Sequence, residues 1–468
     1  MNSTSSRDVA TSSRVTSRSR ASPRFLVSSP SVSPCIAAPI LPSPTDVRVT
    51  SRVYAHPHPS PPGALPWVGT RARRARGRTR SSAHRGGTVP RFLFASDSLK
   101  GTLSSAQTAE LLAAAARRHF PGCRTRAVPM ADGGEGTAQA LALAQGGRMV
   151  RAAAHDALGR PIAASYALLP HGRAVIEMAA AAGLPLVAPA ERDVEAASTA
   201  GVGELISDAL DHGARDVTIA LGGSATNDGG MGCMRALGFR LLGAGREELA
   251  GRGGDLALVR AIDRSHADAR LGRTSFTVMC DVDNPLLGQS GATRTFAPQK
   301  GADAACVERL ERGMANYCRV LRRTFGASFD VPGAGAAGGM GAGCLAFLGA
   351  RAEPGIERVL SLVGFDRLLQ DADLVVTGEG RLDAQTAHGK VVAGIAAACA
   401  RAGVPCVAVV GSVEPGATPP TGVTAVFPTT SGPMTLDYAL AHATELYAQT
   451  AERLFSALAT GARLGASR

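Results

Sequence analysis

The chain has 468 residues, of which 45% are hydrophobic, 4% aromatic and 19% charged, and its formal net charge is +12. This length exceeds one hydrophobic core of usual size, so we expect two or three domains, or one domain with appendages. No apolar run is long enough to predict a membrane span. The nine cysteines lack the paired spacing of a zinc site, which indicates reduced thiols rather than a disulfide framework.

The first 90 residues carry the whole net charge, because they contain 14 arginines, no lysine and only two acidic residues, Asp8 and Asp46. The remaining chain is neutral, so a basic face for nucleic acid is not indicated. Residues 1–90 are rich in Ser, Pro and Arg without apolar periodicity, which predicts disorder. They are interpreted as an organelle transit peptide or, preferably, as the result of a start site placed too far upstream. We therefore expect a cytoplasmic protein, with an organelle as the alternative, and no nucleic-acid or membrane partner.

A buried strand is predicted at 91–95, followed by a helix that begins at the capping-box pair Ser104 and Gln107. Asp97 and Lys100 lie between this strand and this helix. A second strand-to-helix junction, ADGGEGT at 131–137, carries Asp132 and Glu135. These acids suit substrate or metal, but acids before a helix also stabilise its dipole.

Shorter strands from about 160 to 216 indicate a change of domain, with a helix at 203–212 and the acid Glu177 at a strand end. The stretch VTIALGGSATNDGGMG at 217–232 then runs from a strand into a glycine-rich loop. Such a loop before a helix presents free backbone N–H groups to an anion, which favours a phosphate site. The alternative is an ordinary strand-to-helix turn.

Asp281 and Asp283 end the next strand, and because they are one residue apart they face the same side of an extended chain. Paired carboxylates suit Mg²⁺, although an Asx turn before Pro285 is the alternative. A helix is predicted at 303–325. The glycine loop at 333–343 follows, but it matches neither common nucleotide-binding fingerprint.

The last cluster follows a strand at 373–377 and contains Glu379, Asp383 and Lys390. A further strand at 403–413 precedes an amphipathic helix at 435–459, whose leucines are predicted to pack in the core rather than to bind a cofactor. Strands alternate with helices throughout, which predicts an α/β fold with largely parallel sheets. Ligands of such folds bind at the carboxyl ends of strands.

The chain has three lysines against 47 arginines, and each of the three, Lys100, Lys300 and Lys390, is adjacent to a glycine in one of these clusters. A compact ammonium beside flexible glycine suits a phosphate group. Together with the carboxylates and the glycine loops, these lysines favour phosphoryl transfer with Mg²⁺.

Seven motifs in order, DSLKG (97–101), ADGGEGT (131–137), GGSATNDGG (222–230), CDVDNPLLG (280–288), FAPQKGA (296–302), GAGAAGGMG (333–341) and TGEGRLDAQTAHGK (377–390), resemble those of the bacterial-type class I glycerate kinases. The resemblance covers about 91–460. It implies ATP-dependent, Mg²⁺-assisted phosphorylation of D-glycerate, usually to 2-phosphoglycerate. It also implies two α/β domains, one inserted into the other, with the active site in the cleft between them. Leu99 stands where the family usually has Phe, and residues 1–90 have no family counterpart.

We place the inserted domain at 161–289 and a Rossmann-like domain at 91–160 plus 290–468. The predicted site has three groups: the catalytic residues Lys100, Asp97, Asp228 and Lys300, with Asp97 or Asp228 as the base; the substrate- or ATP-binding residues Gly222, Gly223, Ser224, Thr226, Asn227, Lys390, Gly338 and Gly339; and the Mg²⁺ ligands Asp281, Asp283, Glu379 and Asp383. The alternative functions are a kinase of another small hydroxy acid and a non-catalytic sensor of a phosphorylated metabolite.

Overall fold

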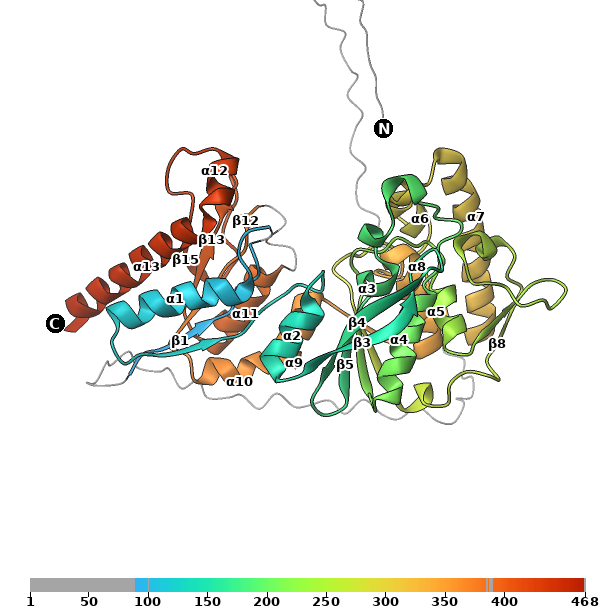
Figure 1. The fold of residues 1–468 in the computed structure, drawn as a ribbon, viewed down its shortest axis with the longest axis horizontal. Helices are drawn as coiled ribbons and strands as arrows, with labels where there is room; N and C mark the ends of the chain where they lie inside the picture. The colour runs from blue at the N-terminus through green and yellow to red at the C-terminus, as the bar shows by residue number, and fades with distance from the viewer. Residues whose placement is uncertain (1–88, 100, 384–385, 387–389, 467–468) are drawn as a thin grey trace, which may run out of the picture. The chain divides into compact units, whose positions relative to one another are not determined.

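The computed structural model describes residues 89–99, 101–383, 386 and 390–466 (Figure 1). Two larger, mostly parallel sheets and the helices around them form the fold, which confirms the predicted α/β class. Most of the predicted residues 1–90 extension, together with Lys100, lies outside the described residues.

The first sheet has five strands, and all of its neighbouring strands are parallel. In spatial order its strands are β15 (Val423–Pro428), β13 (Cys406–Val410), β11 (Leu374–Thr377), β1 (Arg91–Phe94) and β2 (Arg124–Ala127). Side chains of a strand alternate between faces. Phe92 and Phe94 therefore pack with α1 (Ser105–His119) and α13 (Ala443–Ala466), whereas Leu93 packs with α11 (Val391–Ala402) on the other face.

Helix α1 begins where the capping-box spacing predicts. The Ser104 hydroxyl accepts a hydrogen bond from the Gln107 N–H at 3.2 Å, and the Gln107 side chain accepts one from the Ser104 N–H at 2.9 Å. Two backbone N–H groups at the helix start are thereby satisfied. This local pairing fixes where the chain turns after Asp97.

The second sheet has six strands, of which the first four are parallel and the last two antiparallel. In spatial order they are β10 (Arg351–Glu353), β9 (Ser275–Met279), β6 (Asp216–Ala220), β5 (Arg173–Glu177), β4 (Pro161–Leu169) and β3 (Arg148–His155). One face packs with α4 (Ala200–Asp211), α5 (Met231–Ala236) and α8 (Ala336–Leu348).

One hydrophobic core contains residues of both sheets. Leu93 and Val375 from the five-stranded sheet belong to it together with Val175 and Ala220 from the six-stranded sheet. Helices α2 (Thr137–Gln145) and α9 (Gly355–Val363) supply further side chains to this core. The two sheets are thus joined by buried apolar side chains.

Strand membership differs from the domain boundaries expected from the sequence. β3 at 148–155 pairs with β4, and β10 at 351–353 pairs with β9, so the six-stranded sheet takes all its strands from residues 148–353. Helix α7 (Ala304–Phe325) packs with residues of this same part of the chain, such as Leu256. The sequence placed 148–160 and 290–353 with the first domain, because short local patterns do not reveal which strands pair.

The remaining elements are short. They are the helices α3 (Ala179–Ala182), α6 (Ala292–Phe296), α10 (Phe365–Gln370) and α12 (Leu436–Ala441), the strand pairs β7 (Arg240–Leu242) with β8 (Ala261–Asp263) and β12 (Arg381–Leu382) with β14 (Ser412–Val413), and 3₁₀ turns at Leu184–Leu186, Pro189–Glu191, Gly253–Ala257, Leu271–Arg273 and Pro298–Lys300.

Two helix predictions had different outcomes. The helix expected at 303–325 is confirmed as α7, which starts after Asp303, whose side chain accepts from the Cys306 N–H at 2.7 Å. The single helix expected at 435–459 is wrong, because the chain breaks at His442 into α12 and α13.

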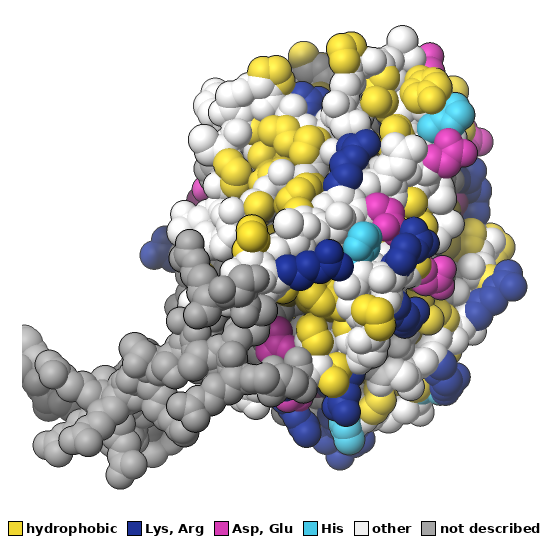
Figure 2. All heavy atoms as spheres, turned by 90° about the vertical axis from the view of Figure 1, so that its left-hand side faces the viewer, with side chains coloured by type: hydrophobic (Ala, Val, Ile, Leu, Met, Phe, Trp, Pro, Cys, Tyr) yellow, Lys and Arg dark blue, Asp and Glu magenta, His cyan; other side chains and the backbone are white. Residues whose placement is uncertain are grey.

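The surface of the folded part mixes charge and apolar groups: Figure 2 shows one face on which basic, acidic and hydrophobic side chains are interspersed. The eight cysteines in the described part of the chain are free, as predicted. Among the described helices, none combines the length and apolarity needed to cross a bilayer.

Candidate active site

The first pocket, with a volume of about 400 Å³, lies at the carboxyl ends of the five-stranded sheet. Each strand contributes through the loop that follows it: Asp97 after β1, Asp132 after β2, Glu379 after β11, Ser412 within β14 after β13, and Thr429 after β15. From β1 the chain continues to its neighbour β2, and from β11 it continues to β13, which lies in the opposite direction across the sheet. Such a reversal of strand order is where open α/β sheets bind ligands. We call this space the switch-point pocket.

Charged side chains line one part of the switch-point pocket. Lys390 Nζ lies 3.7 Å from Asp383 Oδ1. Glu379 is only 6% exposed, and its Oε1 has no hydrogen-bond partner among the described residues. Burial raises the pKa of Glu379 to about 6, against the opposing effects of Thr386 and Lys390. A buried carboxylate with a free oxygen is suited to receive a cation or a donor group.

Asp97 is held by the turn after β1. Its N–H donates to the Gly378 carbonyl at 2.9 Å, and its Oδ1 accepts from the Ser98 N–H at 2.7 Å. The β1 and β11 loops are therefore tied together beside Glu379. Lys100, predicted for the same turn, lies outside the described residues.

The second pocket, of about 470 Å³, lies at the carboxyl ends of β6 and β9. Gly222, Gly223 and Ser224 follow β6 and form one wall, while Asp281 follows β9 and forms another. Gly223 has a φ of +74°, a left-handed conformation that favours glycine. The opening part of the predicted glycine loop thus faces a pocket, which we call the glycine-loop pocket.

Lys300 reaches the glycine-loop pocket from the turn at Pro298–Lys300 and is 2% exposed. Its Nζ donates to Ser224 Oγ at 2.8 Å and to the Thr226 carbonyl at 2.7 Å. Burial lowers the pKa of Lys300 to about 7, although the charge of Asp228 acts in the opposite direction. A lysine in this state gains or loses its proton near neutral pH.

Asp228 is fully buried and is not among the described residues that line either pocket. Its carboxylate accepts hydrogen bonds from the Thr199 N–H at 2.7 Å, the Thr199 hydroxyl at 2.8 Å, and the N–H groups of Gly230 at 3.0 Å and Gly232 at 3.1 Å. Burial raises the pKa of Asp228, and these hydrogen bonds lower it. This geometry organises the glycine loop and does not present a base to a ligand.

Four other predicted binding residues also lie behind the pocket walls. Thr226 and Asn227 are fully buried, and the Asn227 amide donates to Thr293 Oγ1 at 3.1 Å. Gly338 and Gly339 form a kink in α8 with φ of +67° and +88°. A Cβ on Gly338 would lie 2.1 Å from the Thr226 carbonyl oxygen, so these glycines allow α8 to approach the loop.

The four predicted Mg²⁺ ligands are not brought into one group. Asp281 lines the glycine-loop pocket and accepts from the Gly355 N–H, the first residue of α9, at 2.7 Å. Asp283 is exposed and lines neither pocket as described, whereas Glu379 and Asp383 line the switch-point pocket. Within the described residues, no cluster of three or more His, Cys, Asp or Glu side chains has metal-binding geometry.

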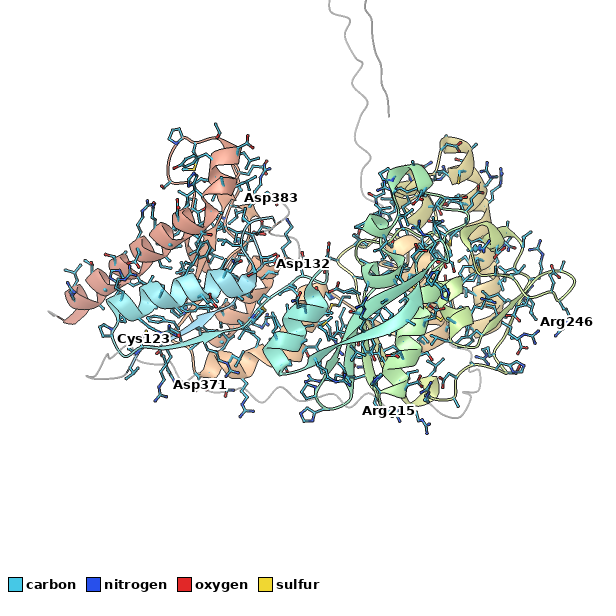
Figure 3. All side chains as sticks on the ribbon, in the orientation of Figure 1. Cys123, Asp132, Arg215, Arg246, Asp371 and Asp383 are labelled. Atoms are coloured by element: carbon cyan, nitrogen blue, oxygen red, sulfur yellow. The ribbon has the colours of Figure 1, made fainter. Side chains whose placement is uncertain are left out.

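Asp132 lines both pockets. Figure 3 shows Asp132 and Asp383 toward one end of the strands of the five-stranded sheet, and Cys123 and Asp371 toward the other end. Its Oδ1 accepts from the Gly134 N–H at 3.1 Å, which closes a local turn. The sequence singled out Asp132 at a strand end but left it out of the final site. Its place between two pockets depends on packing that no local pattern reveals.

Glu177 is a second residue that the sequence placed at a strand end without including it in the site. Its Oε1 accepts from the Ala138 N–H, in the first turn of α2, at 2.7 Å. The residue preceding that helix is Gly136, which has no capping side chain. Burial raises the pKa of Glu177, and its hydrogen bonds to the start of α2 lower it. Glu177 therefore caps α2 from the neighbouring sheet and fixes the loop that carries Asp132.

These features define an α/β enzyme of the phosphotransferase class, since lysines, carboxylates and a glycine loop line two pockets at the carboxyl ends of strands. The model of the "Glycerate kinase family" matches residues 92–459. A glycerate kinase of Bacillus subtilis (strain 168) is 42% identical over 79% of this chain and 97% of its own length. A glycerate 2-kinase of Escherichia coli (strain K12) is 40% identical over 80% of this chain and 99% of its own length.

A solved structure, described as a glycerate kinase 2 from Salmonella typhimurium LT2, superimposes with a TM-score of 0.75 at 40% identity, over 80% of this chain and 100% of that chain. The chain belongs to the glycerate kinase family. It is a kinase of this family, as the resemblance of its motifs implied.

Proposed function

We propose that this enzyme phosphorylates the 2-hydroxyl of D-glycerate, with the acid in the glycine-loop pocket and ATP in the switch-point pocket. The observation that carries this assignment is that Asp132 lines both pockets. A hydroxyl in one pocket and a γ-phosphate in the other would meet beside it. Attack at the 2-hydroxyl is supported by the name of the E. coli relative, glycerate 2-kinase.

Lys300 is the proposed partner of the glycerate carboxylate. It is the lysine of the glycine-loop pocket, and its hydrogen bonds to Ser224 and Thr226 point its ammonium along the pocket wall. Backbone N–H groups at Gly222 and Gly223 are further donors for an anion. A pocket with one buried cation and a small-residue loop suits a small acid better than a nucleotide.

Lys390 is the proposed partner of the ATP phosphates, because it lines the switch-point pocket near Asp383. A lysine ammonium neutralises phosphate charge as a point charge. Lys100 remains a sequence prediction for contact with the substrate carboxylate or the transferred phosphate. Replacing Lys100 with Met is expected to abolish turnover while leaving thermal unfolding nearly unchanged.

Asp132 is the proposed base, in place of the sequence candidates Asp97 and Asp228. The Asp228 carboxylate already accepts four hydrogen bonds and is fully buried behind the loop. Asp97 lines only the switch-point pocket of the two. Asp132 can accept the hydroxyl proton as the oxygen attacks the γ-phosphorus and the bond to the ADP oxygen breaks.

Glu379 and Asp383 are the proposed carboxylates for Mg²⁺. The fit rests on the unpartnered Oε1 of buried Glu379 and on two carboxylates lining one pocket with Lys390. Mg²⁺ needs only one or two protein carboxylates when phosphates and water supply its other ligands. It would neutralise negative charge on the phosphates.

The test is ADP release by the full chain with D-glycerate and with a panel of small hydroxy acids, with and without Mg²⁺, and ³¹P NMR of the product. We expect Mg²⁺-dependent ADP release with D-glycerate and one 2-phosphoglycerate resonance. Faster turnover of another hydroxy acid would make that acid the substrate. Binding without ADP release would support the sensor alternative.

A cytoplasmic location stays a prediction, with an organelle as the alternative if residues 1–90 are a transit peptide. Expressing the full chain and a version starting at Val89, each fused to a fluorescent protein, in the source cell distinguishes the two. An organelle signal that requires residues 1–88 would contradict the cytoplasmic prediction.

A further inference from the structure

One part of the switch-point pocket is apolar, and most of its side chains come from α12 and the first residue of α13. Leu436, Ala439, Leu440 and Ala443 line the pocket here, together with Leu99 from the loop after β1. The sequence predicted Leu436 and Leu440 as core residues, but they are 72% and 48% exposed. The prediction is wrong for these two leucines because the break at His442 separates α12 from the buried part of α13.

Helix α12 has no buried residue, whereas α13 packs Tyr447, Leu454 and Phe455 against the five-stranded sheet. A Thr435 cap, which accepts from the Tyr438 N–H at 3.2 Å, nevertheless starts α12 at a defined point. Single exposed leucines are common on proteins. Leu436 and Leu440, however, lie on one short helix and line the same pocket. They therefore form an apolar surface in the pocket that also contains the charged residues.

The switch-point pocket therefore joins two kinds of lining. Lys390 with nearby carboxylates supplies charge, and the leucines of α12 supply apolar surface. Small hydroxyls, Ser412, Thr429 and Thr430, also line the pocket. A nucleoside triphosphate has the same division, with a planar apolar base at one end, a ribose, and a polyanion at the other.

We propose that the Leu436 and Leu440 face of α12 is the adenine-binding wall of the enzyme. This inference rests on the assignment of ATP to the switch-point pocket under the proposed function. Covering these leucines with the base removes apolar surface from water, and the triphosphate then extends toward Lys390. α12 thus contributes affinity for the nucleotide and none for glycerate.

The experiment measures binding of ADP to the full chain by isothermal titration calorimetry, without turnover. The variants are Leu440→Ser and Leu436→Ser, and the matched control is Leu464→Ser, because Leu464 is 68% exposed on α13 and is not among the described lining residues of the switch-point pocket. Loss of apolar contact is expected to raise the Kd for ADP roughly fivefold to tenfold in each α12 variant. The control is expected to bind ADP as the wild type does.

Inorganic tripolyphosphate, which lacks the base, is the second probe. Its Kd is expected to be equal in wild type and in the α12 variants. An unchanged Kd for ADP in both α12 variants would overturn the proposal, and so would an equal loss of tripolyphosphate binding. These side chains are exposed, so thermal unfolding is expected to be unchanged.

Failure of this inference and failure of the proposed function give different experimental results. Absence of phosphoglycerate from wild-type reactions would refute the phosphorylation proposal. The ADP titrations would still report whether α12 binds the base.

Discussion

Replacing Lys300 with methionine removes the buried cation of the glycine-loop pocket at little change in side-chain length. Two acceptors, Ser224 Oγ and the Thr226 carbonyl, lose their donor, and the glycerate carboxylate loses its proposed partner. A hydrogen bond to a charged group contributes about 1.5–3 kcal/mol, so kcat/KM for D-glycerate is expected to fall roughly 10-fold to 100-fold. KM for ATP is expected to change less than about threefold on the same energy scale.

The pH dependence of turnover is the sharper part of this prediction. Only protonated Lys300 attracts a carboxylate, and its pKa in the free enzyme is about 7. At saturating ATP, kcat/KM for D-glycerate is therefore expected to fall by about tenfold per pH unit above that value. Lys300→Arg keeps its charge and is expected to lose this decline, at lower overall activity.

Stability is expected to depend on pH through the same group. Below pH about 7, Lys300 is charged in the folded and unfolded states, so the burial cost is fully present. Above that pH the folded state releases the proton before the unfolded state does, and stability rises with pH toward 10.5. Between pH 7 and 9 the wild type is expected to gain roughly 2 kcal/mol relative to Lys300→Met.

The assays are initial rates at pH 6–9 with D-glycerate varied, and urea unfolding at pH 7 and 9. A kcat/KM profile that is flat above pH 7 in the wild type would refute the role of the Lys300 proton. Equal stability differences at the two pH values would refute the buried-cation argument.

Three further substitutions test other parts of the site. Glu379→Gln is expected to lower kcat at least about tenfold and to raise the Mg²⁺ concentration needed for half-maximal activity, because it removes a negative charge from the proposed metal site; an unchanged kcat and Mg²⁺ dependence in this variant would exclude Glu379. Asp228→Asn is expected to cost about 1–3 kcal/mol in urea unfolding and to move the decline of kcat/KM toward lower pH, because the charge of Asp228 raises the pKa of Lys300; a decline at the wild-type pH would contradict this electrostatic coupling. Glu177→Ala is expected to cost about 1–2 kcal/mol and to lower kcat, with exposed Glu135→Ala as the control; equal kcat in both variants would contradict the positioning role.

Local features of the sequence predicted local features of the structure. The Ser104–Gln107 capping box starts α1, and the glycine run after β6 forms a pocket wall at 222–224. Lys300 and Lys390, selected because each adjoins a glycine, line different pockets. The glycine run follows a strand directly, so a hydrophobic run followed by small residues was sufficient to find it, whereas the two lysines were found by their adjacent glycines.

Contacts between distant segments were beyond the reach of the sequence patterns. Asp228 is held by Thr199, 29 residues earlier, so its hydrogen bonds could not be read from the loop that contains it. Glu177 caps a helix 39 residues away, and β3 joins the six-stranded sheet through β4. Helical periodicity likewise cannot tell which leucines of 435–459 meet a partner, since that depends on the break at His442.

The assignment of D-glycerate to the glycine-loop pocket and of the nucleotide to the switch-point pocket is tested most directly by calorimetry. D-glycerate and ADP are each titrated into Lys300→Met and into Lys390→Met. We predict that Lys300→Met loses affinity for D-glycerate and keeps its affinity for ADP. Lys390→Met is predicted to show the reverse. Loss of ADP binding in Lys300→Met with retained D-glycerate binding would contradict the assignment of the two pockets.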